Sequence, residues 1–222
     1  MINSLHALFH RPHDGWDPVR REYAETYAAR ECGNVDVALI DQLEQWIGGL
    51  RDKRVLDLGG GPGQYSVAFA QRGALVTWHD VSRNYLRIAR QHADRAGIEL
   101  QFSLGYLDDA GTLGDHPFDL VFNRVCWYYC KNDRSFAKLV YALIKPGGAG
   151  YIDTHPAEVE ERHGASRVAH FFNHWLAWKI GHPFPPHGRV ARLFQQYPID
   201  YMILDYTSAR NDRVFFQKSR VP

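Results

Sequence analysis

The sequence predicts an α/β fold: a doubly wound, mostly parallel sheet of seven strands with helices on both faces. From residue 54 to residue 155, short apolar segments with strand character alternate with longer segments of helical periodicity. Strands that alternate with helices form a parallel sheet that is covered on both sides. Two more strand-like segments follow a break in this pattern. Ligands of such sheets bind at the carboxyl ends of the strands, so we expect the functional site there.

Two helices are expected before the alternation begins. The first starts near Asp17, with Pro18 in its first turn, where proline is tolerated. The second starts at about Val35 and carries an apolar face at helical spacing. That face consists of Leu39, Leu43, Trp46, Ile47 and Leu50. We expect residues 1–50 to form an N-terminal helical cap.

Five strands and three helices make up the alternating part of the chain. The expected strands are RVLDLG (54–59), ALVTWHD (74–80), IELQFSLG (98–105), FDLVFNRV (118–125) and GAGYIDTH (148–155). The expected helices span residues 63–73, 82–97 and 133–148. Ser82 is expected as the N-cap of its helix, and Gly73 and Gly97 as helix stops. The last helix carries an apolar stripe made of Phe136, Leu139, Val140 and Leu143.

After Thr154 the alternation is interrupted by an insertion over residues 155–198. We expect this insertion to contain a helix followed by a proline-rich loop, and to lie on the substrate side of the sheet. Two strands, IDYMILDYTS (199–208) and DRVFFQKSR (212–220), follow it and are joined by a turn. No repeat or linker separates these parts, so residues 1–222 are expected to form a single domain.

Composition and charge limit the classes of function. The 222 residues are 45% hydrophobic, which is enough for a full core. Lys and Arg number 26 against 25 Asp and Glu. Nucleic-acid binders carry a basic excess, so we expect no nucleic-acid partner. No apolar run approaches the length of a membrane span and no signal-peptide pattern is present, so we expect a cytoplasmic protein without membrane contact.

The cysteines favour the same reducing compartment, because three of them cannot all pair. Cys126 and Cys130 lie in CWYYC, with no second pair of ligands nearby. We therefore interpret them as free, buried cysteines rather than metal ligands. The histidines of the N-terminal segment HALFHRPH lack convergent acids, so no metal site is expected there either.

The segment VLDLGGGPGQYSVAFAQRGALVTWHD, residues 55–80, indicates a nucleotide-binding pocket. An apolar strand runs into three alternating glycines, Gly59, Gly61 and Gly63. Glycines at these positions let the backbone turn tightly and approach a ligand. The dinucleotide fingerprint G-x-G-x-x-G fails because no glycine stands at its last position. A P-loop fails because no Lys-Ser or Lys-Thr pair follows the glycines.

The pattern that remains is D-x-G-x-G-x-G, made of Asp57 and the three glycines. It resembles the first motif of the class I S-adenosylmethionine-dependent methyltransferases, and the order of elements over about residues 50–155 is similar to that family. The resemblance implies a Rossmann-like fold, with S-adenosyl-L-methionine as cofactor and S-adenosyl-L-homocysteine as product. Because this cofactor carries a positive sulfonium and an amine but no phosphate, a carboxylate is tolerable beside it.

The resemblance also implies roles for two acids. In the family, the acid that opens the motif, here Asp57, helps to hold the methionine part of the cofactor. The acid at the end of the second strand, here Asp80, accepts hydrogen bonds from the ribose hydroxyls, for which a carboxylate is suited. Val81 would then lie against the adenine ring.

Residues after the third and fourth strands complete the cofactor site that the resemblance implies. Relatives often carry an acid after the third strand that reaches the adenine amino group, but Tyr106 stands there. Either Tyr106 takes this role or Asp108 or Asp109 reaches back, while the backbone of Leu107 contacts the adenine edge. The fourth-strand motif adds Asn123 and Arg124 beside the cofactor. The sequence KPGG, residues 145–148, resembles the family's turn before the fifth strand.

The acceptor of the methyl group is expected between the N-terminal helices, the ends of the fourth and fifth strands, and the insertion. These segments are rich in aromatic residues, and aromatic walls suit a flat or apolar small molecule. The expected acceptor-binding residues are Tyr23, Tyr27, Trp127, Tyr129 and Trp175, and Trp16 belongs to the same aromatic set. The alternative for the aromatic residues of the insertion is the buried face of a lid helix.

Methyl transfer from a sulfonium is an in-line displacement that requires alignment and the exclusion of water. A base is needed only where the acceptor must lose a proton, as a phenol does. His155, directly after the fifth strand, is a candidate base or hydrogen-bond partner of the acceptor. Tyr128 is the second candidate catalytic residue. A purely structural role for His155 is the alternative.

We therefore expect methyl transfer to nitrogen or oxygen of a small, aromatic or heterocyclic acceptor. One alternative is an RNA or protein methyltransferase, which would need a basic strip beside the cofactor. Another is a partner protein that binds S-adenosylmethionine without catalysis, and a third is other chemistry on the same cofactor. The sequence leaves the identity of the acceptor and the oligomeric state open.

Overall fold

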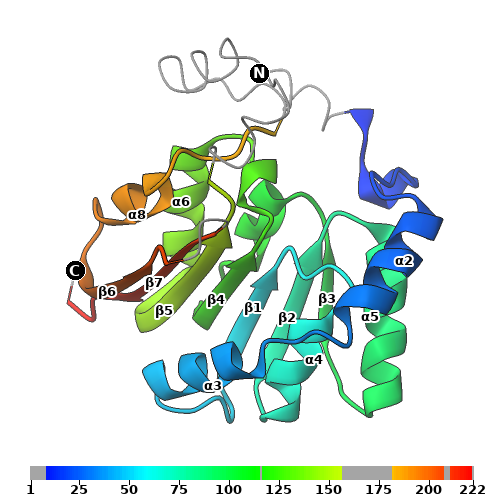
Figure 1. Ribbon diagram of the computed structural model, residues 1–222, viewed down its shortest axis with the longest axis horizontal. Helices are drawn as coiled ribbons and strands as arrows, with labels where there is room; N and C mark the ends of the chain where they lie inside the picture. The colour runs from blue at the N-terminus through cyan, green and yellow to red at the C-terminus, as the bar shows by residue number, and fades with distance from the viewer. Residues whose placement is uncertain (1–8, 116, 157–181, 208–210, 222) are drawn as a thin grey trace.

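The computed structural model describes residues 9–115, 117–156, 182–207 and 211–221. Its strands form one sheet in the order β3-β2-β1-β4-β5-β7-β6 (Figure 1). They are β1 (Arg54–Leu58), β2 (Leu75–Asp80), β3 (Gln101–Leu104), β4 (Phe118–Arg124), β5 (Ile144–Thr154), β6 (Ile199–Asp205) and β7 (Asp212–Lys218). Strands β1 to β5 are parallel, and β7 runs antiparallel between β5 and β6. The prediction of a mostly parallel, seven-stranded sheet is confirmed.

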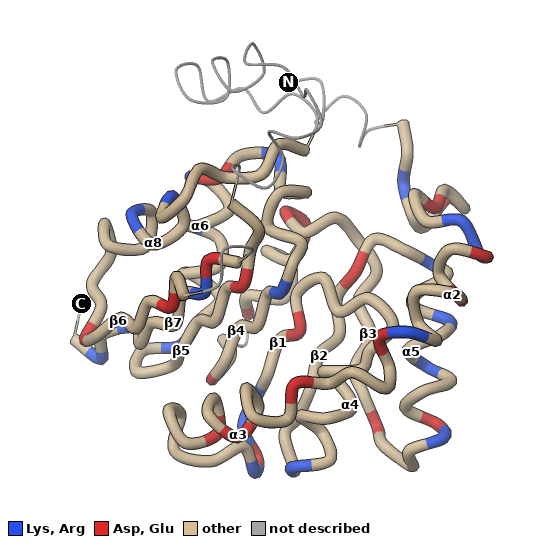
Figure 2. The backbone as a smooth tube through the Cα atoms, viewed as in Figure 1, with Lys and Arg blue, Asp and Glu red and all other residues tan. Residues whose placement is uncertain are grey.

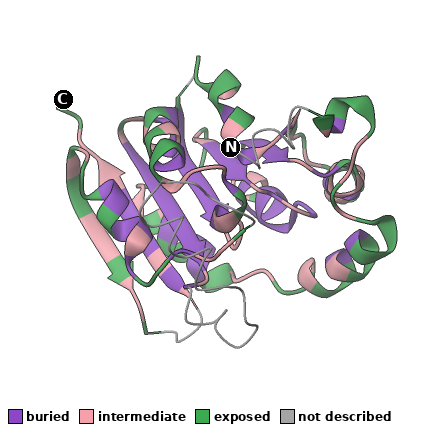
Figure 3. Cartoon of the chain, turned by 90° about the horizontal axis from the view of Figure 1, so that it is seen from above, coloured by how far each residue is buried: buried purple, intermediate pink, exposed green. Residues whose placement is uncertain are grey.

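Helices cover both faces of this sheet. The α-helices are α2 (Arg21–Glu31), α3 (Val37–Trp46), α4 (Gln64–Gln71), α5 (Arg83–Ala96), α6 (Asp133–Leu143) and α8 (Arg189–Phe194), and the 3-10 helices are η1 (Pro12–Asp14), η2 (Leu107–Leu113) and η3 (Trp127–Tyr129). In Figure 1, α3, α4 and α5 lie in front of the sheet and α6 and α8 behind it. Figure 3 shows that the central strands are buried while the edge strand β6 is largely open to solvent.

Each face of the sheet has its own hydrophobic core. In front, α3 and α4 bury Leu43 and Phe69 against the sheet. Behind, α6 and α8 bury Phe136 and Phe194. The apolar stripes that the sequence predicts for α3 and α6 therefore face the cores, and burial of these stripes stabilises the two helices.

Helix α2 begins later than the sequence predicts. Asp17 is not in its first turn, because its carboxylate accepts hydrogen bonds from the backbone nitrogens of Val19 (2.8 Å) and Asn84 (2.8 Å). The backbone N-terminal to the helix is thereby held against the first turn of α5, and the helix starts at Arg21. The expected start near Asp17 is wrong for this reason.

The boundary between α6 and β5 also differs from the expectation. The helix ends at Leu143 and the strand begins at once at Ile144, so KPGG is part of β5. Proline ends a helix because it has no N–H to donate. The Lys218 Nζ donates to the carbonyls of Tyr141 (3.0 Å) and Ile144 (2.7 Å) at this end of the helix. The register between β4 and β5 shifts next to this segment.

The expected helix boundaries around α4 and α5 are confirmed. The Ser82 Oγ accepts from the backbone nitrogen of Tyr85 (3.1 Å) as an N-cap. Gly97 (φ +65°) caps the C-terminus of α5, and Gly73 (φ +87°) follows α4. The helix expected in the first part of the insertion lies outside the described residues, and the proline-rich loop is described from residue 182 up to α8.

Candidate functional site

The three glycines form the turn between β1 and α4. Gly59 and Gly63 have positive φ angles of +84° and +82°. A Cβ at Gly59 would lie 2.3 Å from Cys126 Sγ, and a Cβ at Gly63 would lie 2.8 Å from the Cβ of Ala89. Real Cβ atoms do not approach this closely, so both positions require glycine. At Gly61, by contrast, no atom lies within 4 Å of the Cβ position, so the turn has open space on that side.

Asp80, at the end of β2, is tied to this turn. One carboxylate oxygen accepts from the backbone nitrogen of Gly61 (3.0 Å) and the other from that of Ser82 (2.8 Å). The backbone of Val81 also contributes a hydrogen bond to this carboxylate, which retains acceptor capacity for a ligand. Burial raises the pKa of Asp80 to about 6, because the charged form is poorly solvated there.

Asp57, on β1, is the second buried acid. Its carboxylate is 3% exposed and accepts from the Ser66 hydroxyl (2.6 Å) on α4. Burial, with a further contribution from the charge of Asp80, raises the pKa of Asp57 to about 7. Within the described parts of the chain, neither acid forms an ion pair with a basic side chain. A positively charged ligand would therefore stabilise both carboxylates.

Asn123, near the end of β4, lies beside the end of β1 and the glycine turn. Its Nδ2 donates to the Leu58 carbonyl (2.8 Å) and to Cys126 Sγ (3.0 Å). Its Oδ1 is buried and has no hydrogen-bond partner within the described residues. A buried acceptor without a partner is costly, and a ligand donor would satisfy it.

The chain turns sharply directly after β4. Val125 has φ +56°, a conformation that β-branched residues rarely adopt, and its nitrogen donates to the Asp153 carbonyl (2.6 Å). Such strain concentrates at functional sites, where the surrounding structure holds it in place. The turn places the Cys126 side chain beneath Gly59, a contact that sequence reasoning missed.

Arg124 lies at the end of β4 beside a set of oxygen atoms. Its Nε is 3.3 Å from the Asp153 Oδ2, and its guanidinium lies 5.2 Å from the centre of the Tyr65 ring. Burial opposes the charge of this arginine, but neighbouring oxygens outweigh burial and raise its pKa. These oxygens belong to Tyr65, Asp153, Tyr151 and Tyr27.

Tyr106 does not stand free over the site. Its hydroxyl donates to the His10 carbonyl (2.6 Å), and its ring stacks on Trp16 with centroids 5.9 Å apart. Trp16, which we expected with the acceptor aromatics, thus lies on the side of β3 instead. Asp108 and Asp109 were the alternatives to Tyr106 for reaching the adenine amino group. The Asp108 carboxylate accepts from the backbone nitrogen of Lys131 (2.9 Å), and the Asp109 carboxylate accepts from that of Tyr106 (3.1 Å). Both carboxylates are thus already engaged within the protein.

The N-terminal segment, residues 10–17, also contacts the start of α5, which follows β2. Asp17 Oδ2 accepts from the Asn84 backbone nitrogen and, at 3.3 Å, from the Ser82 hydroxyl. Its charge contributes to the raised pKa of Asp80, after burial. Residues 10–17 therefore cover the ends of β2 and β3, next to Val81 and Leu107. Sequence reasoning did not predict this, because the segment has no motif of its own.

Aromatic and histidine side chains gather at the ends of β4 and β5. Phe184, in the proline-rich loop, contacts Tyr128 (centroids 4.6 Å apart) and His155 (5.5 Å). Tyr129 contacts His182 at 5.0 Å. The described residues thus bring Tyr128, Tyr129 and His155 together with Phe184, which the sequence did not single out. Their role in binding an acceptor stays a prediction. Trp175 lies outside the described residues.

Tyr23 and Tyr27 approach this region from α2. Their rings are stacked, 6.0 Å apart, and the Tyr27 ring lies 5.9 Å from that of Tyr85 on α5. Tyr85 was not expected in the site. Tyr23 is 60% exposed and Tyr27 half-buried, so both offer surface to a ligand.

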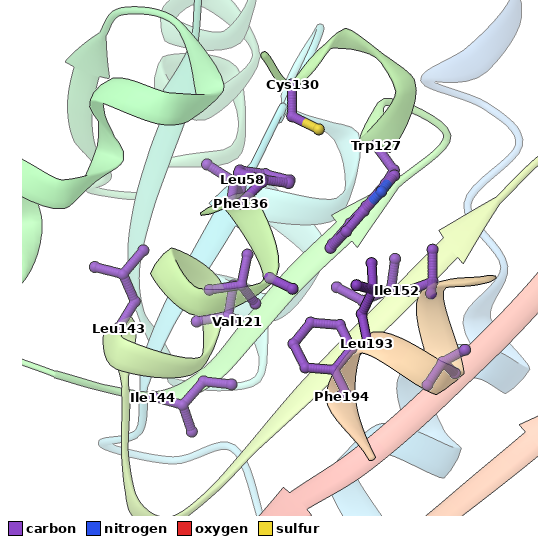
Figure 4. Packing of buried hydrophobic residues seen from close by; sticks show 14 of the residues in the cluster. Leu58, Val121, Trp127, Cys130, Phe136, Leu143, Ile144, Ile152, Leu193 and Phe194 are labelled. Atoms are coloured by element: carbon purple, nitrogen blue, oxygen red, sulfur yellow. The ribbon is translucent and has the colours of Figure 1, made fainter. Parts of the chain in front are cut away.

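Trp127 differs from its aromatic neighbours. Its indole is fully buried and packs on Phe136 (4.8 Å) and Phe194 (5.8 Å), behind the sheet (Figure 4). Its Nε1 lies 3.2 Å from Asp133 Oδ1. The expectation that Trp127 contacts the acceptor is corrected: the turn η3 points this side chain into the core, whereas Tyr129 is exposed.

The surroundings of Tyr128 favour its protonated form. Burial, followed by the neighbouring Tyr129, raises the pKa of its phenol. A phenol with a raised pKa keeps its proton near neutral pH, so Tyr128 is suited to donate a hydrogen bond rather than to act as a base. Of the two candidate catalytic residues, the imidazole of His155 is the one suited to accept a proton.

The described residues contain no group of three or more His, Cys, Asp or Glu side chains placed to hold a metal ion. None of the helices among these residues has the length and hydropathy needed to cross a membrane. The three cysteines are free.

Comparison with known proteins places this geometry in context. Residues 55–148 match the model of a family described as a methyltransferase domain. A ubiquinone biosynthesis O-methyltransferase of Aeromonas salmonicida is 32% identical over 115 residues, which are 52% of this chain and 48% of the relative. The chain spans about half the length of the curated relatives it matches.

Solved structures share the fold at low sequence identity. A protein from Pyrococcus horikoshii has a TM-score of 0.67 and 17% identity, covering 90% of this chain and 100% of its own. The magnesium protoporphyrin IX methyltransferase of Synechocystis, solved with bound S-adenosylmethionine, has a TM-score of 0.56 and 18% identity, covering 82% of this chain and 79% of its own.

Proposed function

Since the chain carries a class I S-adenosylmethionine-dependent methyltransferase domain, we propose that it transfers a methyl group to an oxygen atom of a small aromatic acceptor. S-adenosylmethionine is the cofactor of this domain. The observation that carries the proposal is the pair of buried acids, Asp57 and Asp80, beside the glycine turn. They lack cationic partners within the described residues, and this cofactor is positively charged.

The residues of the site fit the cofactor. Asp57 and the unpartnered Oδ1 of Asn123 are suited to its ammonium and sulfonium end. The free acceptor positions of Asp80 suit ribose hydroxyls, and the open space at Gly61 leaves room for the ligand. Val81, Leu107 and the Trp16–Tyr106 stack would flank the adenine ring.

When bound, the cofactor supplies an electrophilic methyl group on its sulfonium. The protein has to align the acceptor oxygen and exclude water. Phe184, Tyr128 and Tyr129 would hold an aromatic ring at the ends of β4 and β5. Tyr128 donates a hydrogen bond, and His155 accepts the proton that a phenol loses as the oxygen attacks.

Oxygen is favoured over nitrogen as the acceptor atom by the names of the relatives, which are O-methyltransferases. A polynucleotide acceptor is disfavoured by charge: Figure 2 shows Lys and Arg interspersed with Asp and Glu along the described chain, without a continuous basic strip. A small, flat molecule fits the aromatic surface better.

The first experiment is calorimetric titration of the protein with S-adenosylmethionine and S-adenosylhomocysteine. We expect micromolar binding of both. In Asp80→Asn, the affinity should fall at least tenfold, about 1.4 kcal/mol, because the ribose loses an anionic acceptor.

The matched control is Asp94→Asn, which changes an exposed acid on α5, the helix that follows Asp80 in the chain. It should bind like the unmodified protein. If neither ligand binds the unmodified protein, the proposed function is wrong. If binding is intact but no phenolic acceptor is methylated, the catalytic part of the proposal is wrong.

A further inference from the structure

A chain of charged residues crosses the sheet at the acceptor end, in front of β4, β5 and β7. Arg124 lies opposite Asp153 in the register of β4 and β5, and Asp153 lies opposite Arg213 in that of β5 and β7. Asp153 is fully buried, and its Oδ2 lies 3.3 Å from Arg124 Nε and 3.9 Å from Arg213 Nε. Its Oδ1 accepts from the Asn211 amide. Figure 2 shows both signs of charge at this end of the sheet.

Arg124 and Arg213 differ in the number of N–H groups that remain available to a ligand. Arg213 also pairs with Asp205, at 3.4 Å, so both of its carboxylate partners are protein groups. Arg124 uses Nε for Asp153, and its two terminal nitrogens have no hydrogen-bond acceptor within the described residues. The side chain of Arg124 is 30% exposed, so these nitrogens are within reach of a ligand.

Tyr151 provides a second, independent observation at the same place. It is 2% exposed, and its hydroxyl is buried without a hydrogen-bond partner in the described parts of the chain. Both this hydroxyl and that of Tyr27 are close enough to interact electrostatically with Arg124 and raise its pKa. A buried hydroxyl without a partner is unfavourable unless a ligand supplies one.

We propose that Arg124 and the Tyr151 hydroxyl bind a carboxylate group of a ligand at the boundary between the cofactor and acceptor sides of the pocket. A guanidinium presents parallel N–H groups that match the two oxygens of a carboxylate. The charges of Arg124, Arg213, Asp153 and Asp205 already balance, so a ligand carboxylate would be held by the free N–H groups of Arg124 and not by an excess of positive charge. A phosphate dianion would need a further cation.

This inference rests on the proposed function, and the carboxylate has two possible sources. One is the amino-acid end of the cofactor. The other is an aromatic acid that serves as acceptor, held by its carboxylate while its hydroxyl faces the methyl group. The pairs of probes below separate these sources.

The experiment compares two ligand pairs that differ in a carboxylate, by calorimetry with the unmodified protein and with Arg124→Gln. The first pair is S-adenosylhomocysteine and 5′-methylthioadenosine, which lacks the amino-acid end. The second pair, added with saturating S-adenosylhomocysteine, is 3,4-dihydroxybenzoate and catechol. We expect the unmodified protein to prefer the carboxylate-bearing member of one pair at least tenfold, and Arg124→Gln to lose that preference. The pair that responds identifies the source.

A variant that retains the original preference in both pairs overturns the proposal, and so does an unmodified protein without a preference in either. If S-adenosylhomocysteine and 5′-methylthioadenosine both fail to bind the unmodified protein, the proposed function fails first. Arg90→Gln is the matched control, since Arg90 is an exposed arginine on α5 that covers the Phe102 ring. The double variant Arg124→Gln/Asp153→Asn removes both charges together, so it tests the proposal if the single variant does not fold.

Discussion

The two halves of the site are built by different means. On the cofactor side, residues 55–80 supply the glycine turn and both acids, so the essential groups come from one short stretch of sequence. On the proposed acceptor side, the residues come from α2, β4, β5, β7 and the proline-rich loop. The cofactor side is acidic without cationic partners in the described residues, whereas the acceptor side pairs arginines with buried acid and is lined by aromatic rings.

This difference shows how one fold can bind a fixed cofactor with one part of the chain and a variable acceptor with other parts. A cofactor with fixed chemistry can be held by a local motif whose backbone does most of the binding. An acceptor that varies between related enzymes is bound by side chains on several elements, each of which can change independently.

The largest effect is expected for Trp127, which we assign to the core rather than to the acceptor side. Trp127→Ala removes a fully buried indole from between Phe136 and Phe194, and should lower the free energy of unfolding by about 3–5 kcal/mol. Urea denaturation measures this. Tyr129→Ala, at a side chain that is 51% exposed, should change stability by less than about 0.5 kcal/mol. If both variants lost similar amounts of unfolding free energy, Trp127 would not be a core residue while Tyr129 is a surface residue, and the assignment would be wrong.

The next effect concerns the acids of the cofactor side. The pKa of Asp57 is about 7, and an ion pair with the ammonium group of the ligand requires the ionised form. The affinity for S-adenosylhomocysteine should therefore fall by about tenfold for each pH unit below about 7, since the ligand has to displace a proton. Calorimetry between pH 8 and pH 5 measures this slope. Asp57→Asn should bind weakly and depend on pH only below about 6, where Asp80 takes up a proton, whereas Asp94→Asn should keep the slope below about 7.

The same pKa has a consequence for stability without ligand. Between the unfolded value of 3.8 and about 7, the native protein holds a proton on Asp57 that the unfolded chain releases. The contribution of this group to the free energy of unfolding thus decreases as the pH rises through that window. Asp57→Asn should accordingly be more stable than the unmodified protein at pH 8, and a lower stability there would contradict the assignment.

The smallest effect is expected where the N-terminal segment meets the cofactor side. Trp16→Ala removes the ring that stacks on Tyr106. Stacked aromatic contacts contribute about 0.5–1.5 kcal/mol, so the affinity for S-adenosylhomocysteine should fall about threefold to tenfold. Tyr201→Ala, which removes an exposed ring on β6, is the control and should leave binding unchanged. Equal affinities of Trp16→Ala and the unmodified protein would exclude the segment from the pocket.

The sequence predicted the parts of this molecule that are local. The order of strands and helices follows from alternating periodicity, and Asp57 and Asp80 follow from their spacing to the glycines. The start of α2 did not, because the Asp17 carboxylate bonds to Asn84, a partner 67 residues away that no local pattern reveals.

Side-chain direction limited the prediction on the acceptor side. Trp127 and Tyr129 stand two residues apart in the same aromatic run, and only the 3-10 turn sends one into the core and the other to the surface. The unpartnered hydroxyl of Tyr151 and its approach to Arg124 arise from the register between β4 and β5, which a single sequence does not specify.

The position of β7 has a consequence for biosynthesis. This strand follows β6 in the chain but lies between β5 and β6 in the sheet, so β6 is hydrogen-bonded to the sheet through β7. A nascent chain that has emerged only as far as residue 205 therefore has no neighbour for β6 and leaves the β5 edge unpaired. The cofactor side can assemble while translation continues, but the acceptor side has to wait until residues 212–218 have left the ribosome.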